Sequence, residues 1–91
     1  MKQFLVYILR FQNNSLYIGQ TNNLSVRLNE HLSKSTKSSK FAKENGTFKL
    51  VYEESFSTRL EAMRREKQLK GWTRIKKEAL MAGNLELLKK L

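Results

Sequence analysis

Residues 4–10 read FLVYILR, a run that is apolar on both of its alternating faces until it reaches the arginine. Successive side chains of a strand point to opposite faces, so this run predicts a strand covered on both sides. Asn13 and Asn14 give a turn signal, and residues 15–20 read as a second strand. The sequence therefore predicts a β-hairpin at the start of the chain.

The length of the hairpin loop decides which way two tyrosines face. A two-residue loop at Asn13 and Asn14 would place Tyr7 and Tyr17 on opposite faces of the sheet. A three-residue loop, residues 12–14, places Tyr7 opposite Gly19, and the two rings then become diagonal neighbours on one face. A site that uses both tyrosines requires the odd loop.

Capping signals predict the helices. Asn22 or Asn23 can cap the first one, and Thr58 with Glu61 forms a capping box for the second. Thr73 can cap the third, and a cluster of leucines near the end indicates a short fourth. The predicted helices run over about residues 24–34, 59–70, 74–82 and 85–91.

A basic segment and a third strand lie between the first two helices. Residues 33–43 are rich in Ser, Thr and Lys, and the segment reads as a basic loop or as a short helix over residues 40–45 that Gly46 ends. Residues 48–54 alternate like a strand. The side chains expected on its apolar side are Phe48, Leu50 and Tyr52.

The order strand-strand-helix-strand, followed by the C-terminal helices, predicts an α/β (α+β) fold, in which a small antiparallel three-stranded sheet is packed with helices. A chain of 91 residues has room for one small core, so we expect a single domain over residues 1–91.

The charge of the chain indicates the class of partner. Eighteen Lys and Arg residues face eight acidic residues, which gives a net charge of +10. Such an excess is typical of proteins that bind a polyanion, most often nucleic acid. All eight acids are Glu, which favours a site with one carboxylate over a two-metal carboxylate cluster. The lack of Cys excludes disulfides, thiolate nucleophiles and zinc-cysteine sites, and the single His excludes a His-rich metal site.

The N-terminal apolar run is shorter than a signal peptide requires and lacks a small-residue cleavage site. No segment approaches the length that spans a membrane. We therefore expect a cytoplasmic protein with no membrane partner.

Two polar residues of the first helix stand out by their helical spacing. On a helical wheel His31 falls inside the arc of Leu24, Leu28 and Leu32, and Arg27 falls at its edge. These positions suit a site at the rim of the sheet. The structural alternative is a surface arginine beside a half-buried, hydrogen-bonded histidine.

Glu66 stands out on the second long helix. On the wheel it lies in an arc with Leu60, Ala62, Met63 and Leu69, where a carboxylate is costly unless it is paired or bound to a metal. Its ordinary alternative is an i,i+4 ion pair with Lys70.

These residues together carry a family resemblance. Val6-Tyr7-Ile8, Tyr17-Ile18-Gly19, Arg27 with His31, and residues 62–70 resemble the GIY-YIG nuclease domain in order and spacing. The chain looks most like the small stand-alone branch related to the N-terminal nuclease domain of the excinuclease C subunit. The resemblance covers about residues 4–80.

The resemblance implies roles for the first part of the site. Tyr7 and Tyr17 match the tyrosines that position or activate the attacking water, and Arg27 matches the arginine that holds the scissile phosphate. His31 occupies a site position where relatives have His or Tyr. The general base stays open, because a nearby arginine and metal would lower the pKa of a tyrosine, while His31 could accept the proton in relay.

The resemblance also implies a metal. Glu66 matches the single acid that binds one divalent ion, Mg²⁺ or Mn²⁺, and Gly19 matches the glycine that lets the backbone approach closely. The chain departs from the pattern twice. The first motif lacks its glycine, and Gln20 replaces a lysine of the excinuclease relatives, which bears on proton transfer at that position.

The function that follows is a metal-dependent DNA endonuclease that hydrolyses phosphodiester bonds, in DNA repair or recombination. The alternatives are a module on the same fold that binds DNA or structured RNA without cutting it, and a structural basic protein without a site. The residues expected to contact nucleic acid are Gly19, Lys34, Lys37, Lys40, Arg64, Lys67 and Lys70.

Overall fold

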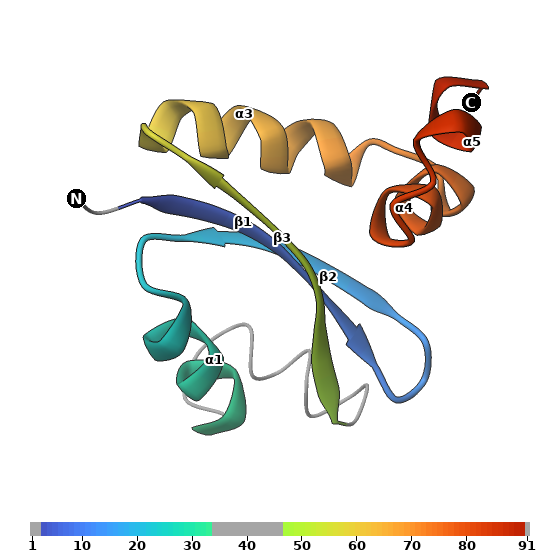
Figure 1. Ribbon diagram of the computed structural model, residues 1–91. Helices are drawn as coiled ribbons and strands as arrows, with labels where there is room; N and C mark the ends of the chain where they lie inside the picture. The colour runs from blue at the N-terminus through green and yellow to red at the C-terminus, as the bar shows by residue number, and fades with distance from the viewer. Residues whose placement is uncertain (1–2, 34–46, 91) are drawn as a thin grey trace.

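The computed structural model describes residues 3–33 and 47–90, and the side chains of these residues apart from 30–33. Three antiparallel strands form one sheet, with β1 (Phe4–Phe11) between β2 (Leu16–Thr21) and β3 (Phe48–Phe56) (Figure 1). The predicted α+β fold is confirmed. The expected basic loop or short helix over residues 33–46 lies outside the described residues, except for Ser33, which ends the first helix.

The helices carry the caps that the sequence predicts. Asn23 accepts a hydrogen bond from the Val26 N–H at 3.2 Å, so it, rather than Asn22, caps the first helix. The Thr58 hydroxyl accepts from the Glu61 N–H at 3.2 Å, and Thr73 accepts from the Lys76 N–H at 3.3 Å. The helices are α1 (Leu24–Ser33), α3 (Arg59–Lys70), α4 (Arg74–Met81) and α5 (Leu85–Lys90).

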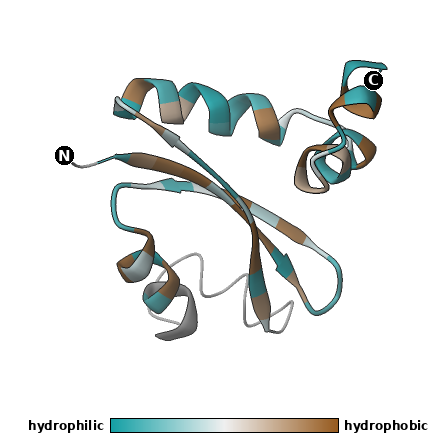
Figure 2. Ribbon diagram, in the orientation of Figure 1, coloured by the Kyte–Doolittle hydropathy of each residue, from teal (hydrophilic) through white to brown (hydrophobic). Residues whose placement is uncertain are grey.

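Helices cover the central strand on both faces. α1 lies against one face of the sheet and α3 against the other (Figure 1), and Figure 2 shows the apolar residues along β1 between them. The buried residues between the sheet and helices α3 and α4 are Val6, Ile8, Ile18, Ala62, Leu69 and Leu80. The residues buried on the side of α1 are Tyr7, Leu9 and Phe11. The prediction that β1 is covered on both sides is confirmed.

The hairpin loop has the odd length that places both tyrosines on one face. The Phe11 N–H donates to the Ser15 carbonyl at 2.9 Å and closes a loop over residues 12–14. Asn14 adopts a left-handed φ of 72°, which Asn tolerates better than most residues. Tyr7 therefore pairs with Gly19, and Leu9 pairs with Tyr17. The predicted register is confirmed.

The expected alternation of β3 is wrong. Leu9 pairs with Leu50, but Ile8 pairs with Tyr52, so Val51 is an extra residue at a β-bulge. The bulge reverses the direction of the side chains that follow it. Phe48 packs on the side of α1, whereas Tyr52 packs on the side of α3.

The expected apolar arc of α3 is also wrong in part. Ala62 and Leu69 are fully buried, but Leu60 is 55% exposed and Met63 is 48% exposed. With 100° per residue, Glu66 lies about 50° from the buried direction that Ala62 and Leu69 define, and Leu60 lies almost opposite to it. Glu66 therefore remains at the edge of the packed face, while two apolar residues point to solvent.

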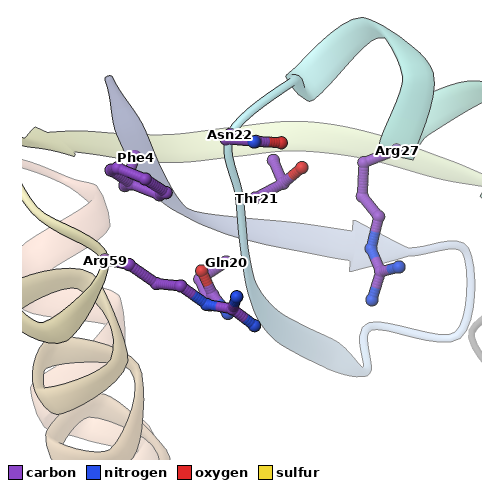
Figure 3. A pocket seen from close by; sticks show the side chains of 6 residues that line it. All are labelled: Phe4, Gln20, Thr21, Asn22, Arg27 and Arg59. Atoms are coloured by element: carbon purple, nitrogen blue, oxygen red, sulfur yellow. The ribbon is translucent and has the colours of Figure 1, made fainter. Parts of the chain in front are cut away.

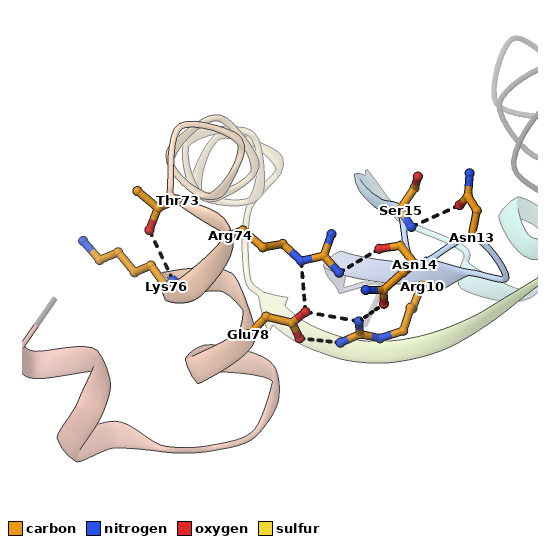
Figure 4. Close-up of polar contacts among 8 residues, drawn as sticks. All are labelled: Arg10, Asn13, Asn14, Ser15, Thr73, Arg74, Lys76 and Glu78. Atoms are coloured by element: carbon orange, nitrogen blue, oxygen red, sulfur yellow. Dashed lines mark hydrogen bonds and ion pairs between the residues drawn. The ribbon is translucent and has the colours of Figure 1, made fainter.

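A polar network joins the C-terminal helices to the hairpin (Figure 4). Arg10 of β1 forms a two-point ion pair with Glu78 of α4. Arg74 donates to Glu78 at 2.9 Å and to the Asn14 carbonyl at 2.7 Å. These contacts hold α4 against the loop end of the sheet. Within residues 3–33 and 47–90, no helix has the length and apolar character that a membrane span requires.

A second ion pair joins β3 to α3. Arg65 donates to both carboxylate oxygens of Glu54, at 2.9 and 3.0 Å, and the Tyr52 hydroxyl donates to the same group. Burial disfavours the charge of Glu54, but the hydrogen bonds from Arg65 and Tyr52 outweigh it and hold the pKa of Glu54 below its ordinary value. Arg65 also lies over Trp72, 5.1 Å from the ring centre.

This network predicts an acid-sensitive contribution to stability. A carboxyl with a lowered pKa stabilises the fold above its unfolded pKa, and the contribution disappears as pH falls through the folded pKa. Glu54→Gln is expected to lower the free energy of unfolding at pH 7 by about 1–3 kcal/mol and to flatten its decline toward pH 3. Thermal unfolding measured from pH 7 to 3 tests this, with the exposed Glu86→Gln as the matched control. An acid profile identical to that of the unmutated protein would contradict it.

Candidate active site

Tyr7 is fully buried, and its ring lies across Gly19 of the neighbouring strand. A Cβ atom at position 19 would lie 2.5 Å from the Tyr7 hydroxyl oxygen and 2.7 Å from ring atom Cζ. Real Cβ contacts are essentially never this short, so any other residue at position 19 would force the buried Tyr7 ring or the strand to shift. Since β2 is an edge strand, this close approach brings the Tyr7 hydroxyl to the edge of the sheet.

Tyr17 and Arg27 join Tyr7 on the same side. The ring centres of Tyr7 and Tyr17 are 6.4 Å apart, with an angle of 32° between the ring planes. Arg27, from α1, donates a hydrogen bond from Nε to the Tyr7 hydroxyl at 3.3 Å. The structure thus brings three of the five predicted catalytic residues together.

Burial sets the protonation of Tyr7. It raises the pKa of Tyr7 to about 12, although the hydrogen bond from Arg27 acts in the opposite direction. The charge of Glu66 raises this pKa further, as does the neighbouring Tyr17. The expectation that a nearby arginine would give a lowered tyrosine pKa is wrong for Tyr7, because burial outweighs the arginine. Tyr7 therefore keeps its proton at neutral pH.

Glu66 reaches the site from the other face of the sheet. Its side chain is 20% exposed and lies at the edge of the α3 surface that packs on the sheet. Its carboxylate influences the pKa of Tyr7, so its charge acts on the same hydroxyl that Arg27 contacts. Lys70 pairs with one carboxylate oxygen at 2.8 Å, which is the ion pair that the i,i+4 spacing predicts.

The donor set fits a hard divalent cation. Mg²⁺ and Mn²⁺ prefer oxygen ligands, and Mg²⁺ commonly keeps several waters while one or two carboxylates hold it. Among the described side chains no three or more acidic, His or Cys groups gather where they could hold a metal. Glu66 is the carboxylate that the resemblance assigns to the ion, and Lys70 pairs with one of its oxygens in this structure.

An open pocket of about 330 Å³ adjoins the candidate site at Arg27 (Figure 3). Arg27 lines it from α1, and Arg59 lines it from the first turn of α3. Arg59 is not among the site residues that the sequence pattern predicts. A signal was present, because Arg59 and Glu66 are seven residues apart and so share one face of the helix.

The structure places the remaining predicted residues unevenly. Gly19, expected to contact nucleic acid, is buried beneath the Tyr7 ring. Lys67 is exposed on α3. Arg64 lines a separate pocket near the end of β3 with Phe56, on the far side of α3 from Glu66. The predicted positions outside the described side chains are His31, Lys34, Lys37 and Lys40.

Comparisons with known proteins agree with this geometry. The family model described as the GIY-YIG catalytic domain matches residues 3–79. UPF0213 protein SH2523 of Staphylococcus haemolyticus is 40% identical over 77 residues, which is 85% of this chain and 92% of that protein. UPF0213 protein YazA of Bacillus subtilis is 40% identical over 72 residues, 79% of this chain and 71% of that protein.

A solved structure is also similar. The solution NMR structure of UPF0213 protein BH0048 from Bacillus halodurans is 36% identical to this chain, with a TM-score of 0.57. The match covers 90% of this chain and 84% of that one. The chain therefore belongs to the GIY-YIG catalytic domain family and, within it, is a UPF0213 family protein.

Proposed function

We propose that this protein is a metal-dependent DNA endonuclease that hydrolyses phosphodiester bonds, with Tyr7, Tyr17, Arg27, His31 and Glu66 as its catalytic residues. The observation that carries the proposal is the hydrogen bond from Arg27 to Tyr7 above Gly19, on which the charge of Glu66 also acts. Two elements far from β1 in the sequence thus act on one buried hydroxyl, α1 through a hydrogen bond and α3 through a charge. A purely structural tyrosine would not need this arrangement.

Arg27 would hold the scissile phosphate. Arginine presents five N–H donors in a fixed fork that matches phosphate oxygens and keeps its charge at any working pH. The contact with Tyr7 uses Nε, and Figure 3 shows the terminal nitrogens extending beside the pocket. This contact fixes the orientation of the guanidinium, which is how a phosphate would be positioned for attack.

Tyr7 would act as a hydrogen-bond donor in this site. A phenol with a pKa of about 12 keeps its proton at neutral pH, so it can donate to the attacking water or to a phosphate oxygen. The proton of the water then needs another acceptor. His31, four residues after Arg27, is the candidate for accepting it in relay that the resemblance supplies, and the general base stays open.

Glu66 would hold one Mg²⁺ or Mn²⁺ ion. When bound, the ion supplies stabilisation of the negative charge on the leaving oxygen. The half-buried position of Glu66 restricts water around the carboxylate, which strengthens its attraction for a cation. Lys70 would neutralise this carboxylate when no metal is bound and would contact the nucleic acid when one is.

The substrate would be DNA, in repair or recombination. The net charge of +10 supports a polyanionic partner, and the excess of Lys and Arg supplies phosphate contacts. The proposed contacts are Lys34, Lys37, Lys40, Lys67 and Lys70. As part of the same proposal, residues 1–91 form one nuclease domain that acts in the cytoplasm.

A second candidate is a module that binds DNA or structured RNA without cleaving it. Two observations favour it. Lys70 pairs with one oxygen of Glu66, which is the carboxylate that we assign to the metal. Gln20 lines the pocket where a lysine was expected from the excinuclease relatives. A site that cannot bind the metal at Glu66, or that lacks a lysine at position 20, would still bind phosphate through Arg27.

A cleavage screen separates the two candidates. Branched, flapped and single-stranded DNA, together with a structured RNA, are incubated with Mg²⁺, with Mn²⁺ and with a chelator. The endonuclease predicts metal-dependent cuts within a strand on at least one DNA. Binding of these DNAs without any metal-dependent product would leave the binding module as the function.

Tyr17→Phe tests the site without removing the ring. The substitution is expected to lower the cleavage rate about tenfold or more and to leave DNA affinity unchanged, since only the hydroxyl is lost. Single-turnover cleavage and equilibrium binding on the same DNA measure the two effects. Tyr52→Phe is the matched control and should keep the rate. The Tyr52 hydroxyl that it removes donates to Glu54 on the other face of the sheet. Equal rates for Tyr17→Phe and the unmutated protein would contradict the assignment.

A further inference from the structure

The pocket beside the proposed active site brings two arginines to one opening (Figure 3). Arg27 extends from α1 and Arg59 from α3, on either side of the end of β2. The polar residues between them are Gln20, Thr21 and Asn22. The Thr21 hydroxyl donates to the Asn23 carbonyl and accepts from the Asn23 N–H. The side-chain amides of Gln20 and Asn22 can donate to an anion.

The charge around Arg59 is unbalanced. Arg65 is paired with Glu54, and Arg10 and Arg74 are both paired with Glu78. The Arg59 side chain forms no ion pair or hydrogen bond with the described side chains of residues 3–29 and 47–90, and no acidic side chain among them lines its pocket. Two like charges at one opening repel each other, and an anion between them would remove that cost.

The position of Arg59 in its helix does not stabilise the fold. It is the first residue of α3, directly after the Thr58 cap. A cation in the first turn opposes the helix dipole, whereas an acidic or neutral residue there is favourable. Arg59 is also exposed, so it contributes little to packing. Its presence is better explained by a ligand than by stability.

Arg59 and the metal-binding position lie on the same face of α3. Seven residues separate Arg59 from Glu66, which corresponds to two helical turns and about 10 Å along the axis. A nucleic-acid strand that places one phosphate between Arg27 and Glu66 can therefore continue along β2 toward Arg59.

We propose that Arg59, with Gln20 and Asn22, binds a second phosphate of the same strand, adjacent to the phosphate that Arg27 holds. This inference rests on the proposed function, because it takes the Arg27 phosphate as the reacting one. The second contact fixes the direction in which the strand crosses the sheet. Arg59 also supplies a permanent positive charge at the opening that Gln20 lines.

Binding of short single-stranded DNA without metal tests the proposal. The probe is an oligonucleotide with hydroxyl groups at both ends, and Arg59→Gln is compared with Arg64→Gln on the opposite side of the same helix. Arg59→Gln is expected to weaken binding about tenfold and to reduce the slope of log K against log salt by about 0.7. Arg64→Gln should have a clearly smaller effect. Thermal unfolding of both variants checks that the fold is retained.

Single methylphosphonate substitutions then locate the phosphate. Each removes one backbone charge, and one position should weaken binding to the unmutated protein but not to Arg59→Gln. Equal losses for the two arginine variants, or a set of methylphosphonates in which every position weakens both proteins equally, would overturn the subsite. An Arg59 effect seen only on 5′-phosphorylated DNA would overturn the assignment to an internal phosphate. Because no step requires cleavage, a protein that does not cut DNA can still confirm the subsite, and one that cuts DNA can still refute it.

Discussion

Glu66→Gln is expected to lower strand cleavage by about 10³-fold or more while DNA remains bound as tightly as before or more tightly. The substitution keeps the size of the side chain but removes the charge that would hold the cation. Removal of a negative charge near the phosphate also reduces repulsion of DNA. The fold should be retained, because glutamine keeps the size of the half-buried Glu66 side chain and an i,i+4 ion pair on a helix contributes only a small energy.

The matched control for Glu66→Gln is Glu61→Gln. Glu61 lies on the same helix, but on the side of the separate pocket near Phe56. Both substitutions change the net charge by the same amount, and a glutamine at position 61 keeps an oxygen that can accept the hydrogen bond from the Thr58 hydroxyl. Single-turnover rates and binding constants on one DNA, with unfolding temperatures for both variants, measure the outcome. Equal loss of cleavage in both variants would show that charge, and not the Glu66 site, determines the rate.

Gly19→Ala is expected to destabilise the protein by about 1–3 kcal/mol and to eliminate most of its cleavage activity. The added methyl group would lie 2.5 Å from the Tyr7 hydroxyl, and that ring is fully buried, so it can move only by disturbing the packing around it. The ring must shift and lose its hydrogen bond from Arg27. A small methyl group thus disturbs the two residues that would bind and orient the substrate.

Gly71→Ala provides the comparison for this prediction. Gly71 has an ordinary φ of −83°, and the nearest atom to an added Cβ is the Gln68 carbonyl oxygen at 3.5 Å. The substitution should change the free energy of unfolding by less than about 1 kcal/mol and leave cleavage intact. Chemical denaturation and cleavage rates measure both variants. If Gly19→Ala behaves like Gly71→Ala, the close approach of Tyr7 to Gly19 has no functional consequence.

Local signals in the sequence determine much of this fold. The caps at Asn23, Thr58 and Thr73 depend on side chains that bond to a backbone N–H three residues away, so a linear pattern reveals them. The hairpin register depends on the length of one loop, which leaves a choice between two and three residues. The three-residue loop predicts that Tyr7 lies opposite Gly19, and the strand pairing confirms it.

Features that depend on tertiary packing could not be predicted in this way. The bulge at Val51 leaves the hydrophobic pattern of β3 intact while it reverses the direction of Tyr52. The exposure of Leu60 and Met63 depends on where α3 meets the sheet, which its own sequence does not specify. The raised pKa of Tyr7 depends on burial between elements that are far apart in the chain. Arg59 belongs to no motif, and its role follows from the way α1 and α3 surround one pocket.

The decisive measurement for the proposed active site is single-turnover cleavage of one DNA by the unmutated protein and by Glu66→Gln, purified in parallel and assayed with Mn²⁺, Mg²⁺ and a chelator. The substrate is the DNA that the screen shows to be bound most tightly, and the products are identified by length and by the chemistry of their ends. We expect the unmutated protein to cut only with a divalent ion, and Glu66→Gln to bind the same DNA without cutting it. Cleavage at equal rates by both proteins, or binding by both without cleavage, would refute the assignment of an active site to these residues.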